Sequence, residues 1–275
     1  MRDVLQGGGL FPATGTTVGS RVAVATTTVQ GPAVLDHTTG ATLRSLPEAG
    51  HPVAVRPDDR VAVISSPNGL TWWDLTDDGD EPLARSGMAA AIGGYSPDGT
   101  LMVSSAGTVV TLWNVADPTS PGVIESWVAD ADVVHAVAVT DGGRVYTSGS
   151  ESLLSAWTPL EPAPPTRVVP TPPSGLTPNH LWLDAAQERA LVSSTSVGNV
   201  GVSAYSLETG DVVGTYLPQL GGDLDQKAVA TWTAAMDAGD GRVAVFDAAG
   251  KGFVFTADDP ERPVARLEGH TGLVN

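Results

Sequence analysis

The chain has 275 residues, no cysteine, and a formal net charge of −17 from 14 basic and 31 acidic side chains. The absence of cysteine excludes disulfides, zinc–thiolate sites, iron–sulfur clusters and cysteine nucleophiles. Nucleic acids and anionic membranes attract basic surfaces, so this charge argues against both as partners. With 41% hydrophobic and 16% charged residues, the chain is expected to fold.

The N-terminal residues do not resemble a secretory signal. Met1–Gln6 lead directly into three glycines, Gly7 to Gly9. A signal peptide would carry an apolar core of about 7–15 residues here. No apolar run elsewhere approaches the roughly 18 residues of a membrane-spanning helix. We therefore expect a cytoplasmic location.

Short, valine-rich stretches recur along the chain and are bounded by Gly, Ser, Asp or Asn. They lie at residues 21–25, 60–64, 100–103, 144–146, 189–192 and 242–246. This pattern is typical of β-strands, and the stretches are too short for helices. Four of them follow turns rich in Pro, Asp or Gly, which favour tight hairpins. These turns lie at 56–59, 96–99, 140–143 and 239–241.

A second strand is expected about ten residues after each of these stretches begins. Each second strand carries an aromatic or apolar residue followed by a polar one. These pairs are Leu35-Asp36, Trp73-Asp74, Trp113-Asn114, Trp157-Thr158, Tyr205-Ser206 and Phe255-Thr256. Successive pairs are 38 to 50 residues apart. The spacing indicates an internal repeat with a period of about 44 residues.

Several motifs in this repeat resemble those of the WD-repeat β-propeller family. They are Gly50-His51, Val53–Asp58, Trp73-Asp74-Leu75, Tyr95–Gly99, Thr111–Asn114 and Leu267–Gly272. Blades in this family are four-stranded antiparallel sheets of about 40–45 residues, marked by Gly-His and Trp-Asp. The resemblance implies an all-β propeller over the whole chain. Because Trp-Asp occurs only at 73–74, the repeats are divergent, and a propeller of another repeat family is the alternative.

The repeat, read in register, predicts one propeller domain over residues 1–275. The expected blades are 9–51, 52–90, 91–133, 134–176, 177–225 and 226–270. Residues 1–8 would form an outer closing strand, and 271–275 would begin a further blade. We therefore expect six blades plus the start of a seventh, an incomplete ring from a longer protein. A six-bladed ring with a short tail is the alternative.

One segment, residues 158–178, contains eight prolines. Proline lacks an N–H donor, so within sheets it is confined largely to edges. Residues 166–169 are therefore predicted as the outer strand of the fourth blade. A polyproline ligand for a partner and a domain linker are the alternatives.

The resemblance also implies roles for particular side chains. In the family, His, Ser or Thr, Asp and Trp of one blade form a hydrogen-bond relay. His51, Ser65 and Trp73 match three of its members, but the turn at 67–69 offers no Asp. The expected structural repeat residues are His51, Ser65, Trp73, Asp74, Trp113, Trp157 and His270.

Catalytic and cofactor motifs are absent from the sequence. It has no HExxH, GxSxG or P-loop, so no catalytic residue, metal site or cofactor is predicted. The acidic groups at 77–81, 130–132 and 223–225 do not have the ligand spacing of a calcium loop, which indicates solvated turns. A propeller enzyme of hydrolase or lactonase type is the alternative function. Its candidate channel residues are His180, Asp184 and Asp237.

Our leading hypothesis is a non-enzymatic scaffold that binds a protein or peptide, as the propeller part of a larger regulatory protein. The acidity favours a basic or neutral partner. Trp72, Trp182 and Trp232 would anchor that partner if exposed, and otherwise pack between blades. Trp72 is expected on the opposite face of its strand from Trp73. A set of blades that only caps or spaces other domains is a third possibility.

Overall fold

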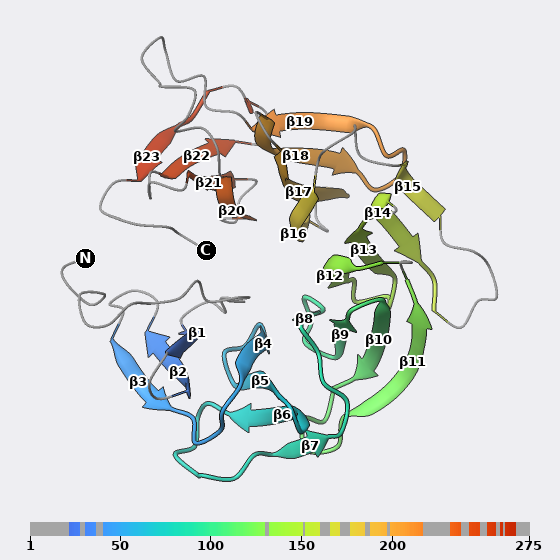
Figure 1. Cartoon of the computed structure of the whole chain (residues 1–275). Helices are drawn as coiled ribbons and strands as arrows, with labels where there is room; N and C mark the ends of the chain where they lie inside the picture. Colours follow the sequence, from blue (N-terminus) through green and yellow to red (C-terminus); the bar gives the residue numbers. More distant parts are fainter. Residues whose placement is uncertain are drawn as a thin grey trace.

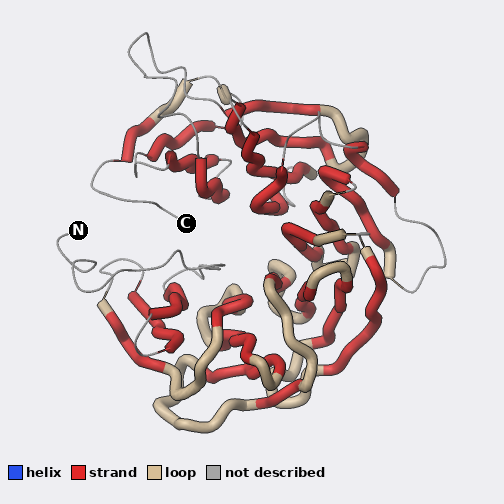
Figure 2. The backbone as a smooth tube through the Cα atoms, viewed as in Figure 1, coloured by secondary structure: helices blue, strands red, loops and turns tan. Residues whose placement is uncertain are grey.

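The chain is described here from a computed structural model. The described residues are 22–27, 31–36, 41–129, 132–150, 152–159, 166–170, 177–184, 188–196, 199–216, 232–237, 242–247, 252–256, 259–260 and 262–267. They form strands, turns and loops and no helix (Figure 2), so the predicted all-β class is confirmed. In this part of the chain no helix is long and apolar enough to cross a membrane.

The described strands form six antiparallel sheets, one of three strands and five of four, and each is built from consecutive strands. The first sheet contains β1 (Val22–Thr27), β2 (Gly31–Asp36) and β3 (Thr42–Ser45). The second contains β4 (His51–Val55), β5 (Val61–Ser66), β6 (Gly69–Asp74) and β7 (Ala84–Ser86). The third contains β8 (Ile92–Tyr95), β9 (Leu101–Ala106), β10 (Val109–Asn114) and β11 (Gly122–Val128).

The remaining three sheets repeat this simple order. The fourth contains β12 (Val134–Val139), β13 (Val145–Gly149), β14 (Ser152–Trp157) and β15 (Thr166–Pro170). The fifth contains β16 (Thr177–Asp184), β17 (Arg189–Ser196), β18 (Asn199–Ser206) and β19 (Val212–Tyr216). The sixth contains β20 (Trp232–Asp237), β21 (Arg242–Asp247), β22 (Gly252–Thr256) and β23 (Ala265–Leu267).

Figure 1 shows the sheets following one another around a central space. In the four-stranded sheets the first strand faces this space, and the fourth lies at the periphery. The β1–β3 and β20–β23 sheets stand at the two ends of the series. Every sheet is open, with two edge strands.

The strands fall where the sequence pattern places them. A strand covers most of each valine-rich stretch, and the first residue of each aromatic–polar or apolar–polar pair also lies on a strand. β15 pairs only with β14, so the predicted outer strand at 166–169 is confirmed as an edge strand. The predicted blade boundaries stay predictions. Closure of the predicted ring depends on the two chain ends, and residues 1–21 and 268–275 lie outside the described residues.

The core is divided among the contacts between successive sheets. Five apolar clusters fill these contacts, each drawing buried residues from two neighbouring sheets. Trp73 packs with Val24 and Val34 of the first sheet, whereas Trp72 packs with Met102 and Trp113 of the third. Alternation along β6 therefore sends the two rings to opposite faces, as expected. The second, third, fourth and fifth sheets therefore each pack against a neighbouring sheet on both faces.

Candidate functional site

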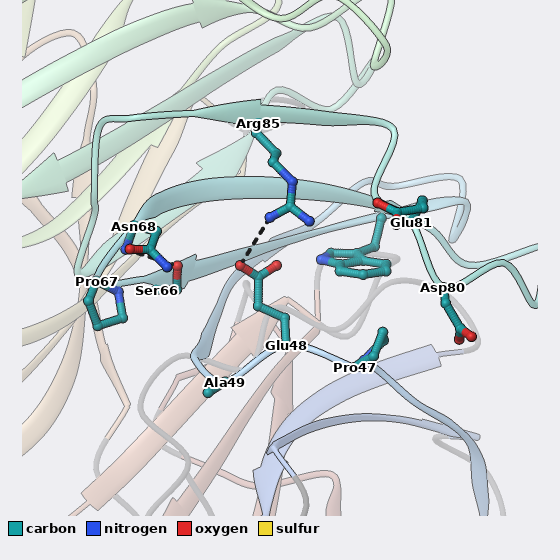
Figure 3. Close-up of a pocket in the computed structure, with 10 residues that line it drawn as sticks. Pro47, Glu48, Ala49, Ser66, Pro67, Asn68, Asp80, Glu81 and Arg85 are labelled. Atoms are coloured by element: carbon teal, nitrogen blue, oxygen red, sulfur yellow. Dashed lines mark hydrogen bonds and ion pairs between the residues drawn. The ribbon is translucent and has the colours of Figure 1, made fainter.

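A pocket of about 480 Å³ opens beside β7, where the first two sheets meet. Its walls come from the β3–β4 link, the β5–β6 turn, the β6–β7 loop, and strands β5, β6 and β7. The lining residues are Pro47, Glu48, Ala49, Ser66, Pro67, Asn68, Trp73, Asp80, Glu81 and Arg85 (Figure 3). The pocket therefore combines three acidic side chains, one basic side chain and several apolar ones.

Glu48 and Arg85 form the charged centre of this pocket. Figure 3 shows the Glu48 carboxylate turned toward the Arg85 guanidinium. The Nη1 to Oε1 distance is 3.6 Å; the Glu48 side chain is 13% exposed and that of Arg85 is 58% exposed. The other carboxylate oxygen, Oε2, is buried and has no hydrogen-bond partner among the described residues. The acid is thus largely buried and only weakly paired.

The β3–β4 link that carries Glu48 is held by close backbone contacts at two glycines. Gly31 has a φ of +77°, and a Cβ there would lie 2.9 Å from the Glu48 carbonyl oxygen. A Cβ on Gly50 would lie 2.3 Å from the Ser65 carbonyl oxygen. Only glycine fits such approaches without displacement. These close approaches give a physical reason for the Gly of the Gly50-His51 pair and for the path of the backbone at Glu48.

Arg44 of β3 fixes the opposite wall. Its guanidinium donates to the carbonyl oxygens of Asp74, at 3.0 Å, and of Asp77 and Gly79. These carbonyls belong to the end of β6 and to the loop that continues to Asp80 and Glu81. Because a guanidinium presents several donors in a rigid plane, it can hold a loop at several points. The acidic wall is therefore tied to the first sheet.

His51 and Ser65 face one another across β4 and β5 and share one backbone partner. The His51 Nε2 atom lies 3.1 Å from the Ala90 carbonyl oxygen, and the Ala90 N–H donates to Ser65 Oγ, also at 3.1 Å. The first contact requires the His51 tautomer with a proton on Nε2. Ala90 precedes β8, so this pair fixes the link between the second and third sheets.

Trp73 does not join His51 and Ser65. Its indole N–H donates to Thr71 Oγ1 on the same strand, at 3.0 Å. The hydrogen bonds of His51, Ser65 and Trp73 therefore do not form the relay that the resemblance implies. Ile64 stands opposite Thr71 and offers no side-chain acceptor to the indole.

Trp113 and Trp157 obtain partners from the neighbouring strand. Trp113 donates to Ser104 Oγ and Trp157 to Thr147 Oγ1, both at 2.9 Å. Ser104 lies opposite Thr111 on the next strand, two residues before Trp113. The three tryptophans are thus structural, with their rings between sheets and their N–H groups satisfied by nearby hydroxyls. His270 lies outside the described residues.

Asp74 stabilises the turn that follows β6. Its Oδ1 accepts hydrogen bonds from the N–H and the hydroxyl of Thr76, both at 2.7 Å. The Thr76 side chain in particular holds the pKa of this carboxyl below its ordinary value. Asp74 is consequently an ionised turn-forming residue.

The three candidate anchor tryptophans have different surroundings. Trp72 has no exposed surface and packs edge-on against Trp113, with ring centroids 5.6 Å apart. The idea that Trp72 contacts a partner is therefore wrong, because neighbouring sheets cover the ring. Trp182 is half-buried and packs against the cluster between the fifth and sixth sheets. The side chain of Trp232 lies outside the described residues.

The candidate channel residues of the enzyme hypothesis are placed by their backbone alone. His180 is the register partner of Ser193 on β17, just as His51 is of Ser65 on β5. His180 therefore holds the position at which His51 performs a structural task. His180 and Asp184 are four residues apart on one strand, roughly 13 Å. The side chains of His180, Asp184 and Asp237 lie outside the described residues, so the hypothesis stays a prediction.

The sequence pattern does not single out Glu48 or Arg85. Both lie in or next to loops that separate predicted strands, where charged residues are ordinary and usually solvated. They are 37 residues apart, close to one repeat, and the packing of the first sheet against the second brings them together. The sequence feature that could have suggested this pair is an acidic residue and a basic residue about one repeat apart.

No family model and no curated protein matches the chain. Among solved structures, the chain is similar to the computationally designed Ika8 protein, with a TM-score of 0.62. The sequence identity is 16%, and the alignment covers 95% of this chain and 76% of the other. At that identity the likeness concerns the fold alone.

Proposed function

We propose that the six sheets are blades of a WD-repeat-like β-propeller that serves as a non-enzymatic scaffold for a protein or peptide partner. On this proposal the ring is an incomplete one from a larger regulatory protein with a cytoplasmic location. The apolar clusters between successive sheets support the propeller, because packing of this kind repeats from one blade to the next.

The observation that carries the binding function is the pocket beside β7. Loops supply most of its lining, while the buried sheets beneath it are held by the clusters around Trp72 and Trp73. Binding surfaces commonly consist of loops positioned by a rigid scaffold. The pocket is polar and open to solvent, with Asp80, Glu81 and Arg85 all exposed. Such an open surface suits a peptide segment better than an enclosed small substrate.

Selection from a random peptide library displayed on phage, against the intact chain, tests the scaffold proposal. We expect an enriched consensus whose synthetic peptide binds saturably in fluorescence polarisation. Substitutions in the 47–49 link should weaken that binding. Thr209→Ala, at an exposed position of the β18–β19 turn, should leave it unchanged. Recovery of no enriched peptide would contradict the proposal, as would hydrolysis of ester or lactone substrates that is lost in His180→Ala.

The propeller arrangement is tested separately by a crystal structure of the chain. We expect the β4, β8, β12, β16 and β20 strands to line one central channel. Two stacked β-layers without a channel would contradict the propeller, whatever the peptide selection shows.

A further inference from the structure

We infer that the pocket beside β7 binds a basic side chain, lysine or arginine, of the partner peptide. The inference rests on the proposed function and specifies the chemistry that the partner carries. It concerns a site at the periphery of the second sheet, formed by Glu48, Arg85 and the acidic residues 80 and 81.

The Glu48 carboxylate is incompletely paired. Its side chain is only 13% exposed, and its contact with Arg85 is 3.6 Å, longer than a good charged hydrogen bond. Oε2 is buried without a hydrogen-bond partner among the described residues. Burying an acidic oxygen is unfavourable unless a donor compensates it. Glu48 therefore has capacity for a second cationic donor.

A ligand can displace the Arg85 guanidinium from Glu48. Its side chain is 58% exposed, so it keeps most of its contact with water. An ion pair this long and this exposed contributes little to stability. A donor that approaches Glu48 more closely can displace the guanidinium into solvent with little loss. Arg85 thus behaves as a weak internal substitute for the ligand.

The pocket walls fit a long basic side chain. Lysine and arginine have an apolar stem and a charged end. Pro47, Ala49 and Pro67 offer apolar contact to the stem, and Glu48, Asp80 and Glu81 offer negative charge to the end. A volume of about 480 Å³ accommodates such a side chain with part of its neighbours.

A small organic cation suits this charge distribution better than a metal ion does. Within the part of the chain that the structure describes, no three acidic or histidine side chains are grouped to hold a metal. The negative charge is instead spread over a link and a loop. The net charge of −17 would also steer a basic segment toward the chain at low ionic strength.

The test titrates the intact, isotope-labelled chain by NMR with three capped tripeptides. Two carry central lysine or arginine, and the third carries norleucine as the neutral control. We expect saturable shifts at residues 47–49 and 66–68 with at least one basic peptide and none with norleucine. Glu48→Gln should weaken the basic peptide about tenfold, as expected for loss of one charged partner.

Two matched variants separate this site from a general effect of charge. Glu208→Gln makes the same change at an exposed position of the β18–β19 turn and should leave the affinity unchanged. Arg85→Ala removes the internal competitor and should strengthen binding. The inference is overturned by any of three results: no saturable shifts, equal losses in Glu48→Gln and Glu208→Gln, or loss of binding in Arg85→Ala. The last result would indicate an anion site.

The library selection distinguishes the two proposals. A consensus without lysine or arginine, whose peptide binds Glu48→Gln and wild type equally, overturns the basic-side-chain inference and leaves the scaffold in place. An empty selection overturns the scaffold, and with it the partner to which this inference refers.

Discussion

Trp73 and Trp113 hold the same register position in adjacent sheets, yet their indole N–H groups find different partners. Trp113 donates across the strands to Ser104, and Trp73 donates along its own strand to Thr71. The difference arises because Ile64 stands in the second sheet where Ser104 stands in the third. The packing of the ring is thus conserved between sheets, while either of two hydroxyls can satisfy its N–H. The third sheet, with Ser104 and Thr111, has both.

Trp113→Ala should have the largest effect on stability. The ring is 2% exposed and makes the edge contact with Trp72 that joins the second and third sheets. Removing a buried tryptophan lowers the free energy of unfolding by about 3–5 kcal/mol. Trp157 is only half-buried, so Trp157→Ala should cost clearly less. Urea denaturation followed by circular dichroism measures both, and equal losses would contradict the role assigned to the Trp72 contact.

Thr71→Val tests the second sheet, in which one hydroxyl serves the tryptophan. The substitution keeps the shape of the side chain but leaves the buried Trp73 N–H without its acceptor. An unsatisfied buried donor costs about 1–3 kcal/mol. Thr111→Val is the matched control, because Trp113 keeps Ser104 and only the hydrogen bond between the Thr111 and Ser126 hydroxyls is lost. The comparison fails if the control loses as much as Thr71→Val.

Ser104→Ala should cost less than Thr71→Val, about 1 kcal/mol or less, because a second hydroxyl is available. Thr111 lies two residues before Trp113, in the place from which Thr71 serves Trp73. Combining Ser104→Ala with Thr111→Val removes both acceptors and should lose more than the two single variants added together. Simple additivity in this double-mutant cycle would show that Thr111 does not replace Ser104.

The sequence predicts the repeat well because periodic burial is a local property. The aromatic–polar pairs at 73–74 and 113–114 mark strands, and their spacing gives the repeat of the sheet. The partner of each indole N–H is harder to predict, since it depends on the register between strands. Ser65 illustrates this limit: the sequence suggests a relay with His51 and Trp73, but Ser65 accepts from the Ala90 backbone.

The pocket was beyond sequence reasoning for a related reason. Glu48 is unusual through its burial and its incomplete pairing, and both depend on how the first sheet packs against the second. The packing of the second sheet against the third likewise covers Trp72, which the sequence alone could not distinguish from an exposed aromatic anchor. Contacts between sheets, rather than those within them, therefore account for what the sequence did not reveal.

The smallest expected effect concerns the residues that follow the two tryptophans. Asp74 accepts hydrogen bonds from Thr76 at the end of β6, and Asn114 Oδ1 accepts the Ala116 N–H, at 3.1 Å, after β10. Hydrogen bonding from Thr76 lowers the pKa of Asp74 in the folded chain. The Asp74 carboxylate therefore makes its full contribution to stability above the pKa that Asp74 has in the unfolded chain, about 4. It is lost as the pH falls through the lowered folded value.

Asp74→Asn should accordingly destabilise the chain at pH 7, and the difference from wild type should shrink as the pH is lowered below about 4. The reciprocal variant Asn114→Asp supplies the control. It should introduce a pH dependence of the same sign, but a weaker one, because Ala116 offers no hydroxyl where Thr76 does. Urea midpoints of the three proteins between pH 7 and pH 3 provide the comparison. A constant gap between Asp74→Asn and wild type would show that the Asp74 turn does not depend on ionisation.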